Sequence, residues 1–139
     1  MEYEIRPVKM GGRVQSIQNS IVKINLFGRL GIISVKKGLI AEKEVHEGDK
    51  LDFYFSYLEI KDYPLDYDIQ ELKTQAEQFP CLMGGKCKEV NDTAVLCEIE
   101  GGLGTIAVPR RWVFTDKVLE EGQNVEFYLS KMQKREEAS

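Results

Sequence analysis

The feature that most constrains the fold of this chain is an internal repeat. Residues 7–45 align with residues 80–118 at a constant offset of 73, and one inserted residue then shifts the offset to 74. Matched glycines and aliphatic residues continue to Ser56 in the first copy and Ser130 in the second. The chain therefore contains two copies of one unit of roughly 50 residues, and we expect each copy to adopt the same structure.

Each unit has the pattern of short β-strands separated by turns. Residues 22–26 and 95–99 alternate between apolar and other side chains, which predicts one buried face on each strand. Residues 51–55 and 125–129 show the same alternation, and glycine-rich turns lie between. Closely spaced short strands favour a small closed barrel over an open sheet, because closure removes exposed edges.

The segment between the units differs from both. Ile69, Leu72, Ala76 and Phe79 recur at helical spacing and are followed by Pro80, which predicts one short linking helix. The predicted fold class is all-β, with two tandem small barrels of the OB type, or a related SH3-like type, joined by a linker containing one helix. The predicted boundaries are 1–58 for the first barrel, 59–79 for the linker, 80–131 for the second barrel and 132–139 for a flexible tail.

Composition excludes several classes of protein. The chain has 139 residues, 42% of them hydrophobic and 30% charged, and no stretch approaches the roughly 20 apolar residues of a membrane span. The first residues lack the features of a secretory signal, and the three cysteines lack paired spacing. We therefore expect a cytoplasmic protein in a reducing compartment, without a membrane partner.

The order of the motifs resembles the ribosomal S-one-type OB domain. The resemblance rests on Gly12, Val14 and Ile17, on the alternating strand, on the Gly-x-x-Gly turn and on a late Glu-Gly-Asp motif, and it covers most of both repeats. Domains of that family bind single-stranded RNA on an open face, usually with exposed aromatics and a histidine. Ser34 and Ala107 stand at the usual histidine position. The resemblance implies RNA binding without those side chains.

Charge is divided unevenly along the chain. Residues 7–56 hold eight Lys and Arg against five Asp and Glu, whereas residues 80–130 hold five against eight. Because affinity for a nucleic-acid backbone comes mainly from Lys and Arg, the first unit is the better candidate for a basic face. The predicted nucleic-acid-binding residues are Lys23, Asn25, Phe27, Arg29, Lys36 and Lys37 in the first unit and Arg110 and Arg111 in the second.

Other reactive residues are predicted to be structural. Trp112 aligns with Leu39, so we expect its ring to pack in the core or between the barrels. The cysteines at 81, 87 and 97 align with aliphatic residues, which favours buried thiols over metal ligands. His46 is the only histidine, and Leu119 replaces it in the second repeat. No catalytic residue, metal site or cofactor is predicted.

The predicted function is that of a non-enzymatic binding module. The first candidate partner is single-stranded RNA, free or in a ribosome, on a basic face of the first barrel. One alternative is a protein partner that binds the acidic linker or the second barrel. The other alternative is a small-ligand sensor that holds an oxyanion between the repeats.

Overall fold

The computed structural model describes residues 5–42, 44–62, 79–115 and 118–135. Strands dominate these residues, and three short 3-10 helices connect some of them. The elements in chain order are β1 (Val8–Gln18), β2 (Ile21–Leu26), β3 (Ile32–Lys36), η1 (Lys37–Leu39), β4 (Lys50–Phe55), β5 (Leu58–Lys61), β6 (Cys81–Val90), β7 (Ala94–Ile99), η2 (Glu100–Gly102), β8 (Gly104–Pro109), η3 (Arg110–Trp112), β9 (Val113–Phe114), β10 (Asn124–Leu129) and β11 (Gln133–Lys134).

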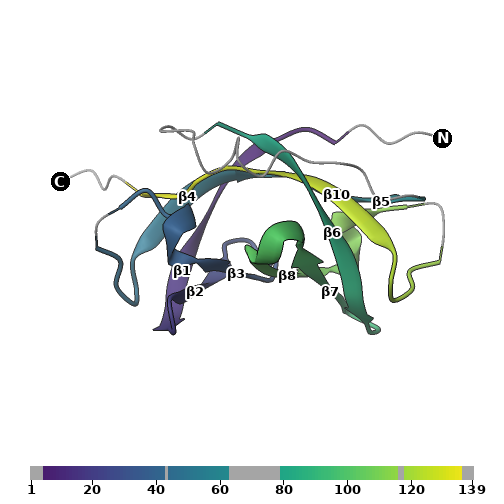
Figure 1. Ribbon diagram of the computed structural model, residues 1–139, viewed down its shortest axis with the longest axis horizontal. Helices are drawn as coiled ribbons and strands as arrows, with labels where there is room; N and C mark the ends of the chain where they lie inside the picture. Colours follow the sequence, from purple (N-terminus) through teal and green to yellow (C-terminus); the bar gives the residue numbers. More distant parts are fainter. Residues whose placement is uncertain (1–4, 43, 63–78, 116–117, 136–139) are drawn as a thin grey trace.

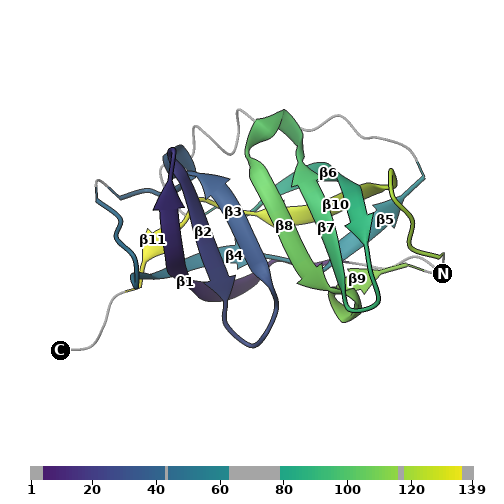
Figure 2. The same cartoon turned by 90° about the horizontal axis from the view of Figure 1, so that it is seen from below.

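The strands form one sheet that closes on itself. The hydrogen-bonded order is β11-β4-β1-β2-β3-β8-β7-β6-β10-β5-β9, and a further pairing between β4 and β10 completes the circuit. Figure 2 shows β1, β2 and β3 of the first repeat beside β8, β7 and β6 of the second. The protein is thus an all-β small-barrel fold, as the sequence predicts. The structure adds that the two repeats share one sheet.

The repeats meet around a local two-fold axis. Ile33 of β3 lies opposite its own repeat equivalent, Ile106 of β8, and Phe55 of β4 lies opposite its equivalent, Leu129 of β10. In Figure 1 the two halves stand side by side under an arch made by β4 and β10. The β3–β8 and β4–β10 pairings are therefore each centred on a pair of matching positions of the two units.

Two glycines make the close contact between β3 and β8 possible. Gly31 and Gly104 are repeat equivalents with φ of 100° and 153°. A Cβ atom added to Gly31 would overlap the carbonyl oxygen of Ala107, and one added to Gly104 would overlap that of Ser34. The second glycine of each Gly-x-x-Gly turn is therefore required because one backbone passes directly against the other.

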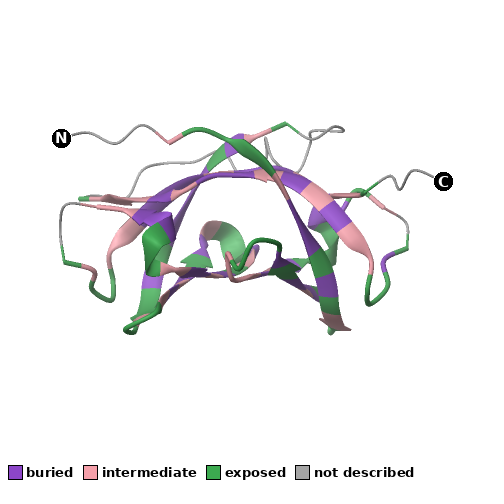
Figure 3. Cartoon of the chain, turned by 180° about the vertical axis from the view of Figure 1, so that it is seen from behind, coloured by how far each residue is buried: buried purple, intermediate pink, exposed green. Residues whose placement is uncertain are grey.

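The core lies between the arch and the strands below it. Buried and exposed residues alternate along the strands, as the banded ribbons of Figure 3 show. The alternating residues of β2 and β7 are buried as predicted, and all three cysteines are buried free thiols. The largest fully buried side chains are Phe53, Phe55, Phe127, Ile24, Ile33, Leu51, Leu58, Met83, Ile99, Ile106 and Leu129.

Each repeat also gives a strand to the other. β5 follows the first repeat but pairs with β10 of the second, and β11 follows the second repeat but pairs with β4 of the first. Two buried serines hold the crossing point. Ser56 Oγ accepts a hydrogen bond from the Tyr128 amide, and Ser130 Oγ accepts one from the Tyr54 amide, each at 2.8 Å.

Two ion pairs hold the exchanged strands at their far ends. Arg135, just after β11, contacts Asp52 on β4, with 2.8 Å from Nη2 to Oδ1. Lys61 on β5 lies 3.8 Å from Glu126 on β10, measured from Nζ to Oε1. Arg135 and Asp52 align with Lys61 and Glu126 at the offset of 74, so the exchange is built in the same way on both sides.

The exchanged strands move two of the predicted boundaries. β5 occupies the start of the predicted linker 59–79, whereas residues 63–78, including most of the predicted helix, lie outside the described residues. The tail 132–139 was predicted to be flexible because it is charged, but Met132 is fully buried and β11 follows it. The Met132 amide donates to the Leu39 carbonyl at 3.0 Å. One apolar residue anchors the start of this charged segment.

Candidate functional site

Four neighbouring strands present one face to solvent. The outward side chains of β2, β3, β8 and β7 are half-buried or exposed, and Lys23 and Asn25 are among them as predicted. We refer to this surface as the outer face, and its members are Lys23, Asn25, Ile32, Ser34, Leu96, Glu98, Thr105 and Ala107. No aromatic ring is among them. The outer face can offer contacts to a polar backbone, but it offers no platform for stacking bases.

Three arginines from the two repeats lie at one end of the outer face, where one side chain crosses the junction between the repeats. Arg111 of η3 reaches across the junction, and its Nη2 donates to the carbonyl oxygen of Arg29 at 3.0 Å. Arg110 Nη1 donates to the carbonyl oxygen of Asn91 at 2.8 Å. Figure 2 shows the β2–β3 turn, which holds Arg29, beside the end of β8, where η3 begins. We call Arg29, Arg110 and Arg111 the arginine edge.

The backbone at Arg29 is in the left-handed region. Its φ is 59°, whereas the equivalent position in the second repeat is Gly102, with φ of 68°. A left-handed conformation is unfavourable for a residue that carries a Cβ, by roughly 1–2 kcal/mol. The first repeat therefore keeps an arginine side chain where the fold itself favours glycine, and such strain points to a role for that side chain.

The arginine edge is a concentration of unneutralised positive charge. All three side chains are exposed. Within the described ranges, no carboxylate lies within 4.0 Å of any of the three guanidinium groups. Guanidinium remains charged at all physiological pH values and presents several donors in one plane, which suits phosphate oxygens.

The other predicted cations lie elsewhere. Lys36 and Lys37 are at the opposite end of β3, where their amides donate to the carbonyls of Leu103 and Ser20. Both line a hollow of about 780 Å³. The structure thus brings Arg29, Arg110 and Arg111 together but separates them from the two lysines by the length of β3. The predicted binding residues therefore form two clusters, the arginine edge and the pair of Lys36 and Lys37. Lys23 and Asn25 lie on the outer face.

Phe27 was predicted as a nucleic-acid-binding residue, and its ring is the one aromatic side chain in that set. It is 38% exposed, but the guanidinium carbon of Arg135 lies over the ring, 5.1 Å from its centre. Asp52 fixes that guanidinium through hydrogen bonds to Nε and Nη2. One face of Phe27 is therefore occupied by a cation from the exchanged segment.

Trp112 packs in the core, as predicted. Its side chain is 9% exposed, and Nε1 donates to the carbonyl oxygen of Ser56 at 2.9 Å. The ring stacks on Tyr57 with 3.8 Å between ring centres, and Tyr57 stacks in turn on Phe114 at 4.2 Å. Because Tyr57 leads into β5, the aromatic stack also joins the two repeats.

Groups suited to metal or acid–base chemistry do not cluster in the described part of the chain. No group of three or more His, Cys, Asp and Glu side chains there could hold a metal ion. Burial raises the pKa of the Cys97 thiol to about 12 and also raises the pKa of Cys87, so neither is a reactive thiolate at neutral pH. Across the same residues, no helix has the length and apolar character needed to cross a membrane.

Comparison with known proteins identifies no family for this chain. No protein-family model matches the chain, and no curated protein matches it. Among solved structures, the chain is similar to the cytoplasmic molybdate-binding protein ModG with molybdate bound. The identity is 14% and the TM-score 0.29, over 90% of this chain and 92% of that one. Similarity at this level carries no function over to this protein.

Sequence reasoning missed part of the surface around the lysines. Ile21, Gly38 and Leu103 line the same hollow as Lys36 and Lys37, and none of the three was singled out. The repeat alignment held a usable signal, because Gly38 aligns with Arg111 and Leu39 with Trp112. Where a large residue of one repeat aligns with a small residue of the other, the repeat with the small residue has unfilled space. Here that repeat is the first.

Proposed function

We propose that this protein is a non-enzymatic binding module for single-stranded RNA, which it holds by the phosphate backbone at the arginine edge. The observation that carries the proposal is the meeting of Arg29 with Arg111, whose Nη2 lies 3.0 Å from the Arg29 carbonyl oxygen. Arg110 extends the same positive edge. The three guanidinium groups come from both repeats, so the whole chain is needed to form the edge.

The outer face determines how RNA would bind. Lys23 of β2 lies opposite Ser34 of β3, and Ser34 lies opposite Thr105 of β8. These side chains provide one cation and two hydroxyl groups on the outer face, between the arginine edge and the two lysines at the other end of β3. In the absence of aromatic rings on this face, affinity comes from neutralising phosphates rather than from stacking, so binding is independent of sequence and sensitive to salt.

The acidic character of the whole chain restricts this interaction to one region. The formal net charge is −4, and Glu98 also faces outward from β7. RNA is repelled from most of the surface and attracted only where cations gather without carboxylate partners. This restriction favours modest affinity and a defined position.

Fluorescence anisotropy of a labelled, mixed-sequence RNA twenty-mer at several salt concentrations tests the proposal. For single strands, each phosphate contact contributes about −0.7 to the slope of log affinity against log salt. We expect Arg110→Gln/Arg111→Gln to weaken binding by about tenfold and to reduce that slope by about 1.4, which is about 0.7 for each cation removed. The control is Lys86→Gln, which removes one exposed positive charge from β6 and should bind as the parent does. Lys88 is kept, because its Nζ lies 3.3 Å from Glu98 Oε2 of the outer face.

A second variant separates function from folding. Arg29→Gly copies Gly102 and relieves the left-handed strain, so it should raise the free energy of unfolding by up to about 1 kcal/mol while weakening RNA binding. A variant that is more stable yet binds RNA less tightly cannot owe the loss to misfolding. If RNA does not bind at low salt, or if both arginine variants bind as the parent does, the proposal is wrong.

A further inference from the structure

A separate pocket lies at the end of β3 opposite the arginine edge. We call it the η1 pocket; its volume is about 780 Å³, and its lining residues are Asn19, Ser20, Ile21, Lys36, Lys37, Gly38, Leu39, Ile40, Glu42 and Leu103. This volume is within the range of pockets that hold small organic ligands. Leu103 comes from the second repeat, so both copies contribute to the wall.

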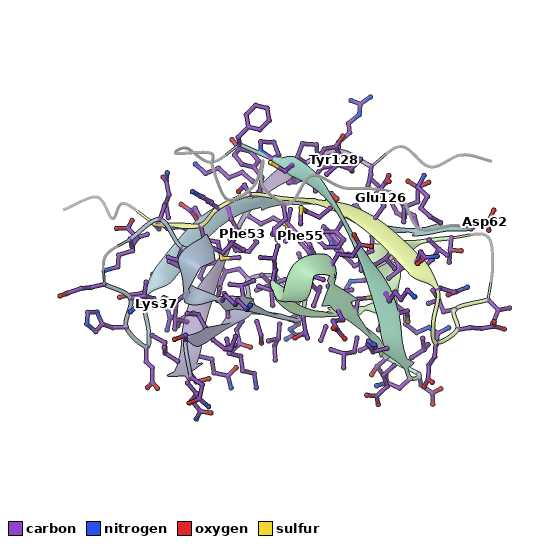
Figure 4. All side chains as sticks on the ribbon, viewed as in Figure 1. Lys37, Phe53, Phe55, Asp62, Glu126 and Tyr128 are labelled. Atoms are coloured by element: carbon purple, nitrogen blue, oxygen red, sulfur yellow. The ribbon has the colours of Figure 1, made fainter. Side chains whose placement is uncertain are left out.

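The wall and the mouth of the η1 pocket differ in chemistry. Ile21, Leu39 and Leu103 give apolar surface, and Ile21 is 37% exposed. Lys36 and Lys37 are exposed, and neither has a carboxylate within 4.0 Å among the residues that the structure describes. Figure 4 shows Lys37 on the outside of the first repeat, away from Phe53 and Phe55 in the interior.

The acidic residue of the pocket does not cancel this charge. Glu42 Oε1 accepts a hydrogen bond from the backbone amide of Lys134 at 3.0 Å, so the carboxylate is held against the exchanged strand β11. Among the residues that the structure describes, two cations therefore lie beside an apolar wall with no carboxylate within 4.0 Å. Such a pair favours an anion that brings its own apolar surface.

The second repeat shows that an open pocket is not a requirement of the fold. At the matching positions Trp112 replaces Leu39 and Arg111 replaces Gly38, and the Arg110 side chain donates to the Asn91 carbonyl. Gly38 has no conformational reason to be glycine, because its φ is ordinary and a Cβ added there would meet no atom within 4 Å. The first repeat keeps small residues where the fold accepts large ones.

We propose that the η1 pocket binds a small organic anion. A ring-sized apolar body lies against Ile21, Leu39 and Leu103, and a single carboxylate, sulfonate or phosphate group lies between Lys36 and Lys37. An inorganic oxyanion alone would leave the apolar wall unused. The site is independent of the arginine edge, because the length of β3 separates the two.

Titration with anilinonaphthalene sulfonate, a fluorescent organic anion, tests this inference. Its uncharged parent, N-phenyl-naphthylamine, has the same ring system without the anionic group. We expect Lys36→Gln/Lys37→Gln to weaken binding of the sulfonate by about tenfold and to leave binding of the uncharged parent within about twofold. Lys86→Gln/Lys88→Gln is the matched control and should leave both unchanged.

Two further variants close the pocket in different ways. Leu39→Trp copies the second repeat and should abolish binding of both dyes. Since Leu39 is buried and the larger ring could disturb folding, Gly38→Glu provides a second test, because it adds a negative charge at the mouth where a side chain has room. We expect at least tenfold weaker sulfonate binding with an unchanged melting temperature.

The outcomes separate this inference from the proposal on RNA. Leu39→Trp should leave affinity for the RNA twenty-mer unchanged, whereas Arg110→Gln/Arg111→Gln should leave dye binding unchanged. If the sulfonate binds Gly38→Glu and the lysine variant as tightly as the parent, the dye binds elsewhere and the η1 pocket is not an anion site. If the sulfonate and its uncharged parent bind equally well, the anionic part of the inference is wrong.

Discussion

The two repeats have the same backbone fold at equivalent ends, η1 in the first and η3 in the second. Their surfaces differ, because the η1 end is open and the η3 end is filled. At the first, Leu39 and Gly38 leave a hollow with two lysines beside it. At the second, Trp112 fills the equivalent position and Arg111 extends over the junction to Arg29. The difference shows that a handful of substitutions on a duplicated scaffold can convert one end into a pocket and the other into a charged edge.

The filled end is also the better stabilised of the two. Trp112, Tyr57 and Phe114 form a continuous stack, and pairs of this kind contribute roughly 0.5–1.5 kcal/mol each beyond the burial of their surface. The η1 end has Leu39 and Ala41 of the first repeat, and Lys131 from the segment after the second repeat, at the corresponding positions. The open η1 end therefore has fewer packing contacts than the η3 end. Substitutions that open the η3 end should lower the free energy of unfolding, and substitutions that fill the η1 end should raise it.

The largest expected effect comes from breaking the junction that both ends share. In Gly104→Val, the new side chain would overlap the Ser34 carbonyl and would need φ near 153°, so the β3–β8 pairing cannot form as it stands. We expect a loss of more than about 3 kcal/mol in the free energy of unfolding, measured by urea denaturation.

The matched control for the junction is Gly38→Ala. It adds a Cβ to a glycine that has open space and an ordinary φ, so it should change stability by less than about 0.5 kcal/mol. Similar losses in the two variants would show that glycine content in general, and not the approach of the two backbones, limits stability.

A smaller effect follows from making the second end resemble the first. Trp112→Leu removes two ring contacts and the hydrogen bond to Ser56, and we expect it to cost about 2–4 kcal/mol in urea denaturation. The space that it leaves should admit a second molecule of N-phenyl-naphthylamine. An unchanged dye stoichiometry would mean that the core collapses into the space, so the difference between the ends depends on more than side-chain size.

The smallest effect concerns the thiols that distinguish the second repeat from the aliphatic core of the first. Burial raises the pKa of Cys97 from 9.0 to about 12, so the unfolded chain releases this proton at lower pH than the folded chain does. The resulting stability is fully present below pH 9.0 and is lost as the pH rises toward about 12, by about 1 kcal/mol per pH unit.

The variant Cys97→Val tests this dependence directly. Valine has no proton to release, so the decline in unfolding free energy between pH 9.0 and pH 10.5, measured by urea denaturation, should be shallower than in the parent by about 1 kcal/mol. Equal declines in parent and variant would show that groups common to both proteins, Cys87 among them, control alkaline unfolding.

The sequence predicted what depends on local pattern. Alternation placed Val22 and Ile24 in the core, and alignment with aliphatic residues identified the buried thiols. The exchange of β5 and β11 could not be predicted in this way, because the strand pattern of Leu58 or Gln133 does not specify which neighbour it pairs with. The contact of the Arg111 side chain with the Arg29 carbonyl depends on the long-range pairing of β3 with β8, so the sequence predicts both arginines as binding residues but not that they lie together.

The exchanged strand β11 has a consequence for how the protein is made. The first repeat binds β11 along β4 and buries Met132 beside Ile40, so its part of the shared sheet stays incomplete until residues 129–134 have been synthesised. During translation, the edge of β4 remains open to pairing with other chains. We expect the nascent chain to fold as a whole after synthesis and not repeat by repeat, and therefore to fold slowly for its size.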